Sequence, residues 1–171
     1  DLVWERTEPA FDRLVASKLT SQHDAVYGYE FSSLSTFRRA RELGMSTIYD
    51  MPAPETSLVQ EILAHEAELH PVLRTPYSRH TANREAPRTE RRRLEWEHAD
   101  MVIAASQFTR NSFSKAGFSP DKIKVVPYGA PPAVELKKAE AGGSQNPKLQ
   151  LLWAGSFNVR KGAHYLLQAW R

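Results

Sequence analysis

Apolar positions recur along the chain with two different periods, which indicates that helices and strands alternate. Spacings of three or four residues predict amphipathic helices, and short apolar runs predict strands between them. The expected helices cover residues 9–19, 33–43, 55–69, 87–98, 106–116 and 162–171. The expected strands cover residues 24–29, 45–49, 101–104, 123–126 and 149–154. Strand–helix–strand units of these lengths require right-handed crossovers, so the pattern predicts an α/β fold with a parallel sheet and flanking helices.

Hydroxyl side chains mark the expected starts of three helices. Thr7 is the predicted N-cap of the first helix, with Pro9 in its first turn. Ser32 or Ser33 is the predicted cap of the second helix, and Ser106 that of the helix over 106–116. Each of these side chains is expected to accept a hydrogen bond from a free amide of the first helical turn.

Two of the predicted strands have the apolar character of buried sheet interior. Residues 101–104 read Met-Val-Ile-Ala without a polar position, and residues 123–126 are nearly as apolar. Such continuous runs are typical of strands in a sheet that is covered on both faces. The polar, basic stretch 71–86 fits neither period and is expected to be a mobile loop.

The composition changes after residue 129. Residues 130–148 contain two adjacent prolines, a charged run and a Gly-Gly-Ser sequence, which together favour a linker. We therefore expect a Rossmann-like lobe over 1–129, a linker over 130–148, and the first strand, loop and helix of a second Rossmann-like lobe over 149–171. On this interpretation the chain stops inside its second lobe.

Composition and charge restrict the function only loosely. Hydrophobic residues make up 41% of the chain and charged residues 25%, which is ordinary for a globular protein. The absence of Cys excludes disulfides and thiolate metal sites, and the six His residues have no spacing that predicts a metal site. The net charge of +3 suits anionic small molecules or an anionic membrane surface. No metal or other cofactor is expected.

The predicted strand-to-helix loop at residues 155–162 is the strongest candidate site. Loops of this kind in α/β sheets present free helix amides to anions. Gly155 allows a close turn, while Arg160 and Lys161 add positive charge ahead of Gly162. Lys161 precedes rather than follows a Walker-type glycine, so the loop is not a P-loop. The alternative is a solvated basic turn.

Several motifs together resemble one enzyme family. The order of the sequences VVPYG (125–129), LLWAG (151–155), RKG (160–162) and LLQA (166–169) resembles the domain junction of retaining family 4 glycosyltransferases. The sequence ADMVIAAS (99–106) resembles a strand and capping Ser of the acceptor lobe in that family. The resemblance covers the chain from about residue 24 to its end and implies the two-lobed GT-B architecture.

The resemblance implies transfer of a sugar from a nucleotide-diphosphate donor to a carbohydrate or lipid-linked acceptor. Lys161 matches a family Lys that holds the donor diphosphate. Ser156 stands where the family has an Arg, and the neighbouring Arg160 is expected to compensate. An acidic motif of the donor lobe is expected beyond residue 171, so the chain alone is expected to be inactive.

Two further places are candidates. Asp50 lies where many relatives carry a His facing the donor sugar, and a carboxylate there would bind a sugar hydroxyl; the alternative is an Asp that starts a Pro-containing turn. Glu30 has the same two interpretations. Tyr128 and Gly129, between lobe and linker, are predicted to form a hinge, and a plain turn glycine with positive φ is compatible with that role.

The Arg-rich stretch 88–93 raises the possibility of binding to an anionic membrane or to nucleic acid. Helical pairs such as Arg91–Glu95 and Arg93–Glu97 favour a solvated helix face instead. We expect a cytoplasmic protein with at most peripheral membrane contact and no nucleic-acid partner.

Two alternatives to a glycosyltransferase stay open. One is a nucleotide-sugar epimerase or other GT-B enzyme. The other is a non-catalytic or split module that docks or self-associates through an exposed apolar patch on 149–171.

Overall fold

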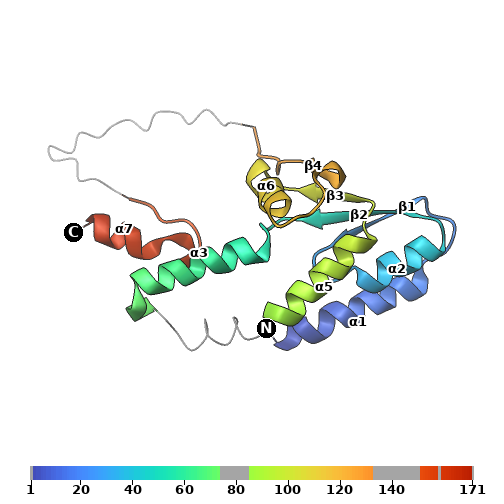
Figure 1. The fold of residues 1–171 in the computed structure, drawn as a ribbon, viewed down its shortest axis with the longest axis horizontal. Coiled ribbons are helices and arrows are strands. Elements are labelled where there is room, and N and C mark those ends of the chain that lie inside the picture. Colours follow the sequence, from blue (N-terminus) through green and yellow to red (C-terminus); the bar gives the residue numbers. More distant parts are fainter. Residues whose placement is uncertain (1, 74–84, 133–150, 158, 171) are drawn as a thin grey trace. The chain divides into compact units, whose positions relative to one another are not determined.

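The computed structural model describes residues 2–73, 85–132, 151–157 and 159–170 (Figure 1). The chain divides into two compact units, Asp1–Tyr128 and Gly129–Arg171. The first unit contains a four-stranded, all-parallel sheet flanked by helices. The prediction of an α/β fold with a Rossmann-like parallel sheet is therefore confirmed for this unit.

The strands of the first unit follow one another in space as they do in sequence, in the order β1-β2-β3-β4. They are β1 (Ala25–Tyr29), β2 (Ser46–Met51), β3 (Met101–Ala104) and β4 (Ile123–Val125). The helices are α1 (Leu2–Lys18), α2 (Leu34–Glu42), α3 (Thr56–Leu69), α5 (Glu85–His98) and α6 (Gln107–Lys115), with 3-10 turns η1 (Pro71–Leu73) and η2 (Pro120–Lys122). Much of the predicted loop over 71–86 lies outside the described residues.

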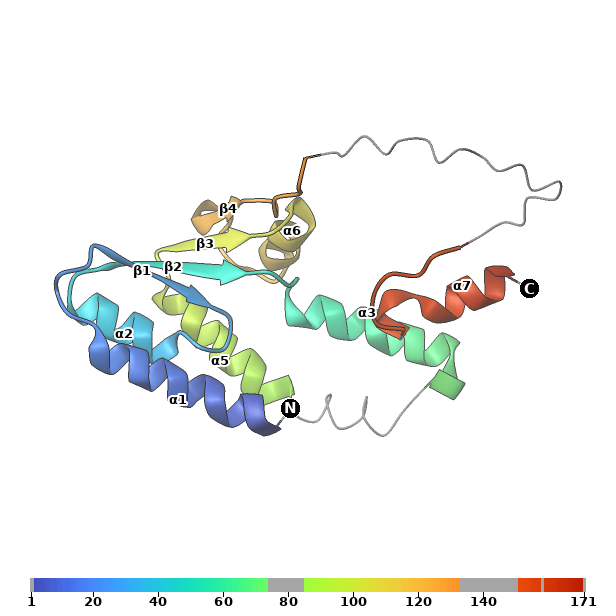
Figure 2. The ribbon, with the colours of Figure 1, turned by 180° about the vertical axis from the view of Figure 1, so that it is seen from behind.

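The core lies on one face of the sheet. Right-handed crossovers between sequential neighbours place every connecting helix on the same side, and α1, α2 and α5 lie together on one side of the strands in both views (Figures 1 and 2). Phe37 of α2, Trp96 of α5 and Phe113 of α6 pack with the inward strand residues in one cluster. The strand residues in that cluster are Tyr49, Met51, Val102, Ala104 and Ile123.

The opposite face of the sheet is open within the described part of the first unit, contrary to the prediction of a sheet covered on both faces. On this face no residue of the four strands is buried, and Tyr27 and Tyr29 are 61% and 52% exposed. Met101 and Ile103 are only partly buried. The apolar character of β3 is thus satisfied on one side alone.

Helix α1 begins earlier than its cap signals predict. It starts at Leu2 and contains Pro9, so Thr7 is a helix-interior residue rather than an N-cap. The Thr7 hydroxyl donates to the Val3 carbonyl at 2.9 Å, a bond back to the preceding turn. The predicted cap is therefore wrong, because the helix already begins five residues before Thr7.

Helix α2 packs unusually close to β1. An added Cβ at Gly28 would lie 2.3 Å from Ser33 Oγ and 2.7 Å from Phe37 Cε1. The Ser33 hydroxyl donates to the Tyr29 carbonyl at 2.7 Å, which ties the start of the helix to the end of the strand. Gly28 is therefore required by the close approach of the helix.

Buried carboxylates, rather than a serine, satisfy the amides between β1 and α2. Ser33 is the N-cap residue, but its side chain makes no capping bond. Instead, the Asp12 carboxylate of α1 accepts from the Ser35 and Thr36 amides at 2.7 and 2.8 Å. These bonds help to hold the pKa of Asp12 below its usual value against the opposing effect of burial. The predicted cap position at Ser33 is therefore confirmed, but the expected bond from its side chain is not formed, because a residue distant in sequence takes its place.

Glu95 of α5 holds the same loop from the other side. Its fully buried carboxylate accepts from the Phe31 amide at 2.9 Å and from the Ser33 amide at 3.0 Å. The Tyr49 hydroxyl donates to it at 2.5 Å, and Arg91 pairs with it at 3.2 Å. Arg91 also pairs with Asp12 at 2.7 Å, so one guanidinium bridges the two loop-binding carboxylates.

The described part of the second unit contains the 3-10 turn η3 (Val159–Lys161) and helix α7 (Ala163–Trp170). The helix confirms the prediction for 162–171, but residues 151–154 form no strand, contrary to the prediction for 149–154. A strand must pair its amides and carbonyls with a neighbour. The described residues of this unit contain no strand with which residues 151–154 could pair. Residues 133–150, which contain most of the predicted linker, lie outside the described part.

None of the helices that the structure describes combines the length and apolar character of a membrane span.

We predict that Glu95→Ala lowers the free energy of unfolding by about 3–5 kcal/mol, because it leaves two loop amides and the buried Tyr49 hydroxyl without their acceptor and removes one partner of Arg91. Urea unfolding of both proteins measures the difference. Glu97→Ala is the matched control, since Glu97 pairs with Arg93 on the exposed side of the same helix and should cost at most ~0.5 kcal/mol. Equal losses would contradict the role of Glu95.

We predict that Gly28→Ala costs about 1–3 kcal/mol, because the new methyl group would overlap Ser33 and force α2 away from β1. Gly129→Ala is the control, as an added Cβ there meets no atom within 4 Å. Both values come from the same urea titration. A Gly28→Ala protein as stable as the control would show that α2 can shift without loss.

Candidate functional site

Asp50 lies near the carboxyl end of β2 on the open face of the sheet. Parallel pairing aligns it with Tyr29 of β1, so the two residues are direct neighbours on that face. The Tyr27 hydroxyl donates to Asp50 Oδ2 at 2.7 Å. Asp50 is only partly buried. Its position at the carboxyl end of a parallel strand is where α/β folds bind their ligands.

Three tyrosines accompany this carboxylate. Tyr27, Tyr29 and Tyr128 are each more than half exposed, and Tyr128 lies close enough to influence both others electrostatically. The hydrogen bond to Asp50 raises the pKa of Tyr27 to about 12. Burial is the main cause of the raised pKa of Tyr29. Sequence reasoning predicted Tyr128 only as part of a hinge and missed Tyr27 and Tyr29, although these two are two apart in a strand and must share a face.

Glu30 faces inward and away from this surface. It is buried beside Arg92, with which it forms an ion pair, and burial raises the pKa of its carboxyl. Arg92 also bonds the Thr56 hydroxyl at the start of α3. The contacts favour a structural role for Glu30 over the sugar-binding one.

The N-terminus of α2 is closed to outside anions. It follows β1 directly, at a position where many α/β proteins bind phosphate. Here the Asp12 and Glu95 carboxylates already occupy the amides of this turn. A phosphate would have to displace them and would meet their negative charge. Any anion site of the chain must therefore lie elsewhere.

The loop at 155–162 has a defined backbone in its described part. Gly155 and Gly162 have φ values of 127° and 76°, which only glycine adopts readily. The Trp153 indole donates to the Gly155 carbonyl at 3.1 Å, and the Gly162 carbonyl accepts from the Tyr165 and Leu166 amides at the start of α7. Ser156, Arg160 and Lys161 are all exposed. The basic residues thus lie immediately before a helix start. Among the described residues, no strand precedes the loop.

The Arg-rich stretch is less available for external binding than a solvated face would be. Arg91 and Arg92 are committed to buried carboxylates, and Arg88 stacks on the Phe31 ring at 3.8 Å from its centroid. Phe31 itself has a φ of 67°, and its amide and carbonyl are bonded to Glu95 and Arg91. Both predicted helical pairs form, but only Arg93–Glu97 is exposed, because the Glu95 partner of Arg91 is buried. Arg93 also pairs with Glu90.

Two other clusters carry less functional information. A surface hollow of about 660 Å³ is lined by Arg38, Arg41, Glu42, Glu97 and His98. Burial and the two neighbouring guanidinium groups lower the pKa of His98. Two carboxylates balance the two arginines, and Arg41 donates to the Glu97 carbonyl near the end of α5. These contacts favour helix capping over anion binding.

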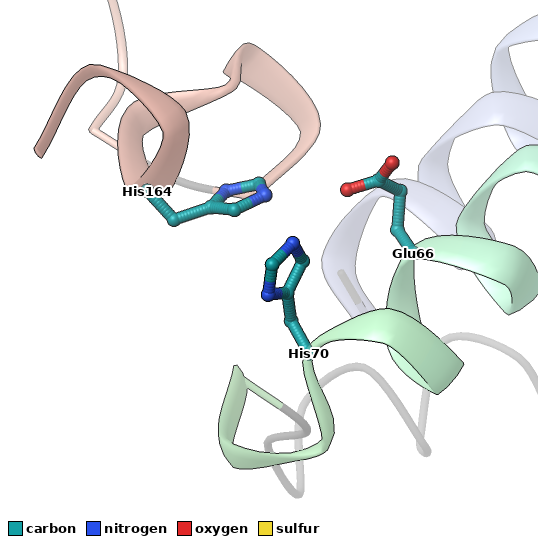
Figure 3. Close-up of side chains that lie close together, drawn as sticks. All are labelled: Glu66, His70 and His164. Atoms are coloured by element: carbon teal, nitrogen blue, oxygen red, sulfur yellow. The ribbon is translucent and has the colours of Figure 1, made fainter. Parts of the chain in front are cut away.

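Figure 3 shows Glu66 and His70, which lie one helical turn apart at the end of α3. His164, drawn with them, belongs to α7 in the second unit. Two side chains on one helix do not by themselves define a metal centre, because a metal needs three or four ligands held by a defined structure.

The predicted hinge coincides with the boundary between the units, which falls between Tyr128 and Gly129. Gly129 does not have a positive φ, so the simple turn interpretation is wrong on that point. Its hinge role stays a prediction.

Comparison with protein-family models and with curated proteins finds no match to this chain. The resemblance to glycosyltransferases rests on its sequence motifs alone.

We predict that Tyr27 ionises near pH 12 in the folded protein and that Asp50→Asn moves this value toward the ordinary ~10. The bond to Asp50 stabilises the neutral phenol, so its contribution to stability is complete below pH ~10 and is lost as pH rises toward 12. NMR of ring-labelled tyrosine follows the titration, and Tyr27→Phe identifies the signal. Superimposable curves for the parent and Asp50→Asn would contradict the bond.

Proposed function

We propose that the chain belongs to a two-lobed, retaining family 4-type glycosyltransferase that transfers a sugar from a nucleotide-diphosphate donor. The observation that carries the proposal is the Asp50 carboxylate, which is half-buried near the carboxyl end of a parallel strand and is held by Tyr27. A carboxylate in this position can bind sugar hydroxyls. The order of sequence motifs from residue 99 onward supports the same enzyme class.

Each candidate residue has a distinct role in this proposal. Arg160 and Lys161 would neutralise the charge that develops on the leaving diphosphate, a mainly electrostatic contribution. Gly155 and Gly162 would shape the loop so that its backbone can approach the phosphates. Asp50 would orient a sugar through its hydroxyls. No metal or other cofactor enters the proposal, because the two cations carry the charge.

A second candidate function is that of a docking module that binds a partner chain. The observation that favours it is the exposure of large apolar side chains in the second unit, among them Leu152 at 94% and Trp170 at 59%. This module would self-associate or bind a partner through the second unit. Sedimentation analysis of the chain with and without residues 149–171 distinguishes it, since only the complete chain should associate.

We predict that UDP or GDP shifts the backbone amide signals of residues 155–162 in ¹⁵N NMR spectra of the chain. Lys161→Ala should weaken this binding about tenfold, because it removes a charge-assisted bond to phosphate. Ser156→Arg, which restores the family residue, should strengthen it.

Lys115→Ala is the matched control, since it removes an exposed lysine from α6 in the first unit. It should leave the affinity unchanged. Absence of any shift at millimolar nucleotide, or equal affinities for Lys161→Ala and the parent, would overturn the role of the loop.

A further inference from the structure

We define the tyrosine surface by four side chains: Tyr27, Tyr29 and Asp50 on the open face of the sheet, and Tyr128, which influences both other tyrosines electrostatically. All four belong to the first unit. Tyr29 and Asp50 are register partners on adjacent strands, which lie about 4.8 Å apart in sheets. Tyr27 is bonded to Asp50, and Tyr128 lies near both other tyrosines. The hydrogen bond and the strand register therefore bring Tyr27, Tyr29 and Asp50 together on one face.

The three aromatic rings do not belong to the buried core cluster. They are 61%, 52% and 69% exposed for Tyr27, Tyr29 and Tyr128. Among the residues that the structure describes, none of the three stacks on another ring. Aromatic rings left open beside a polar group are typical of binding surfaces, where one side of the ring is apolar and its hydroxyl is wet.

The polar part of the surface is held in place. The bond from Tyr27 to Oδ2 fixes the Asp50 carboxylate, while Oδ1 has no partner among the described residues. Pre-organised groups of this kind lose little side-chain entropy when a ligand binds. The carboxylate can accept hydrogen bonds from hydroxyl groups, and it repels phosphate and sulfate.

We propose that the tyrosine surface binds a sugar ring, whose C–H face stacks on a tyrosine while its hydroxyls donate to Asp50. A sugar is the ligand class that offers an apolar face and several hydroxyl donors on one small ring. The negative charge of Asp50 disfavours phospholipid head groups and nucleic acid. The assignment of this surface as a substrate subsite rests on the proposed function. If that function holds, the bound sugar is one of the two sugar substrates of the transfer.

The test uses the complete chain and a panel of methyl glycosides of glucose, galactose, mannose and N-acetylglucosamine. Saturation-transfer NMR detects binding through the sugar C–H protons, and titration gives the affinity. We expect binding of at least one glycoside, weakened about five- to tenfold by Tyr29→Ala or Asp50→Asn. Tyr29→Phe should retain most of the affinity, because it keeps the ring.

Phe108→Ala is the matched control, since Phe108 is an equally exposed aromatic residue on α6. It should leave sugar binding unchanged. Absence of binding for the whole panel, or equal affinity for Tyr29→Ala and the parent, would overturn the proposal. A concentration-dependent dimer that Tyr29→Ala abolishes would also overturn it, by showing that a second copy covers the surface.

Nucleotide titration of the 155–162 loop separates this inference from the proposed function. Nucleotide binding without sugar binding would defeat the tyrosine surface and leave the donor loop standing. Sugar binding without nucleotide binding would support the tyrosine surface as a sugar site and remove its assignment as a transferase subsite.

Discussion

The fold of the first unit depends on the buried carboxylate of Glu95. It accepts hydrogen bonds from two amides in the tight connection between β1 and α2 and from the Tyr49 hydroxyl of the sheet. It also pairs with Arg91. Because Arg91 also pairs with Asp12, helix α1 is attached to the same network. The acceptors of this network lie on α1 and α5, and its amide donors lie in the loop and in the first turn of α2. Its geometry thereby fixes how far α2 lies from the strand that precedes it.

The same network decides where a ligand can bind. By placing two carboxylates at the start of α2, it removes the first crossover as an anion site. The candidate sites that remain are the open face, where Asp50 is half-buried and the tyrosines are exposed, and the basic loop of the second unit. These two places have opposite charge. The first is suited to hydroxyl groups and the second to phosphates, and the proposed transfer from a nucleotide sugar would need both.

Periodicity was sufficient to predict the parallel α/β fold, because helix and strand periods depend on local sequence. Contacts between distant residues were not predictable in this way. No local signal shows that Asp12 replaces Ser33 as the acceptor at α2. Residues 151–154 have the apolar character of a strand, but strand formation needs a paired neighbour. Asp50 was predicted as a candidate from sequence, whereas its tyrosine neighbours depend on which face of the sheet is open.

The long sequence separation of the Glu95 contacts has a consequence for folding kinetics. Its partners Phe31 and Ser33 lie 64 and 62 residues away, so closing this loop carries a large entropic cost before any contact forms. Strands β3 and β4 with α6 span only residues 101–125, and their contacts are local. Local contacts form faster than distant ones. The C-terminal half of the first unit should therefore assemble first, with the N-terminal half docking onto it as Glu95 meets its loop.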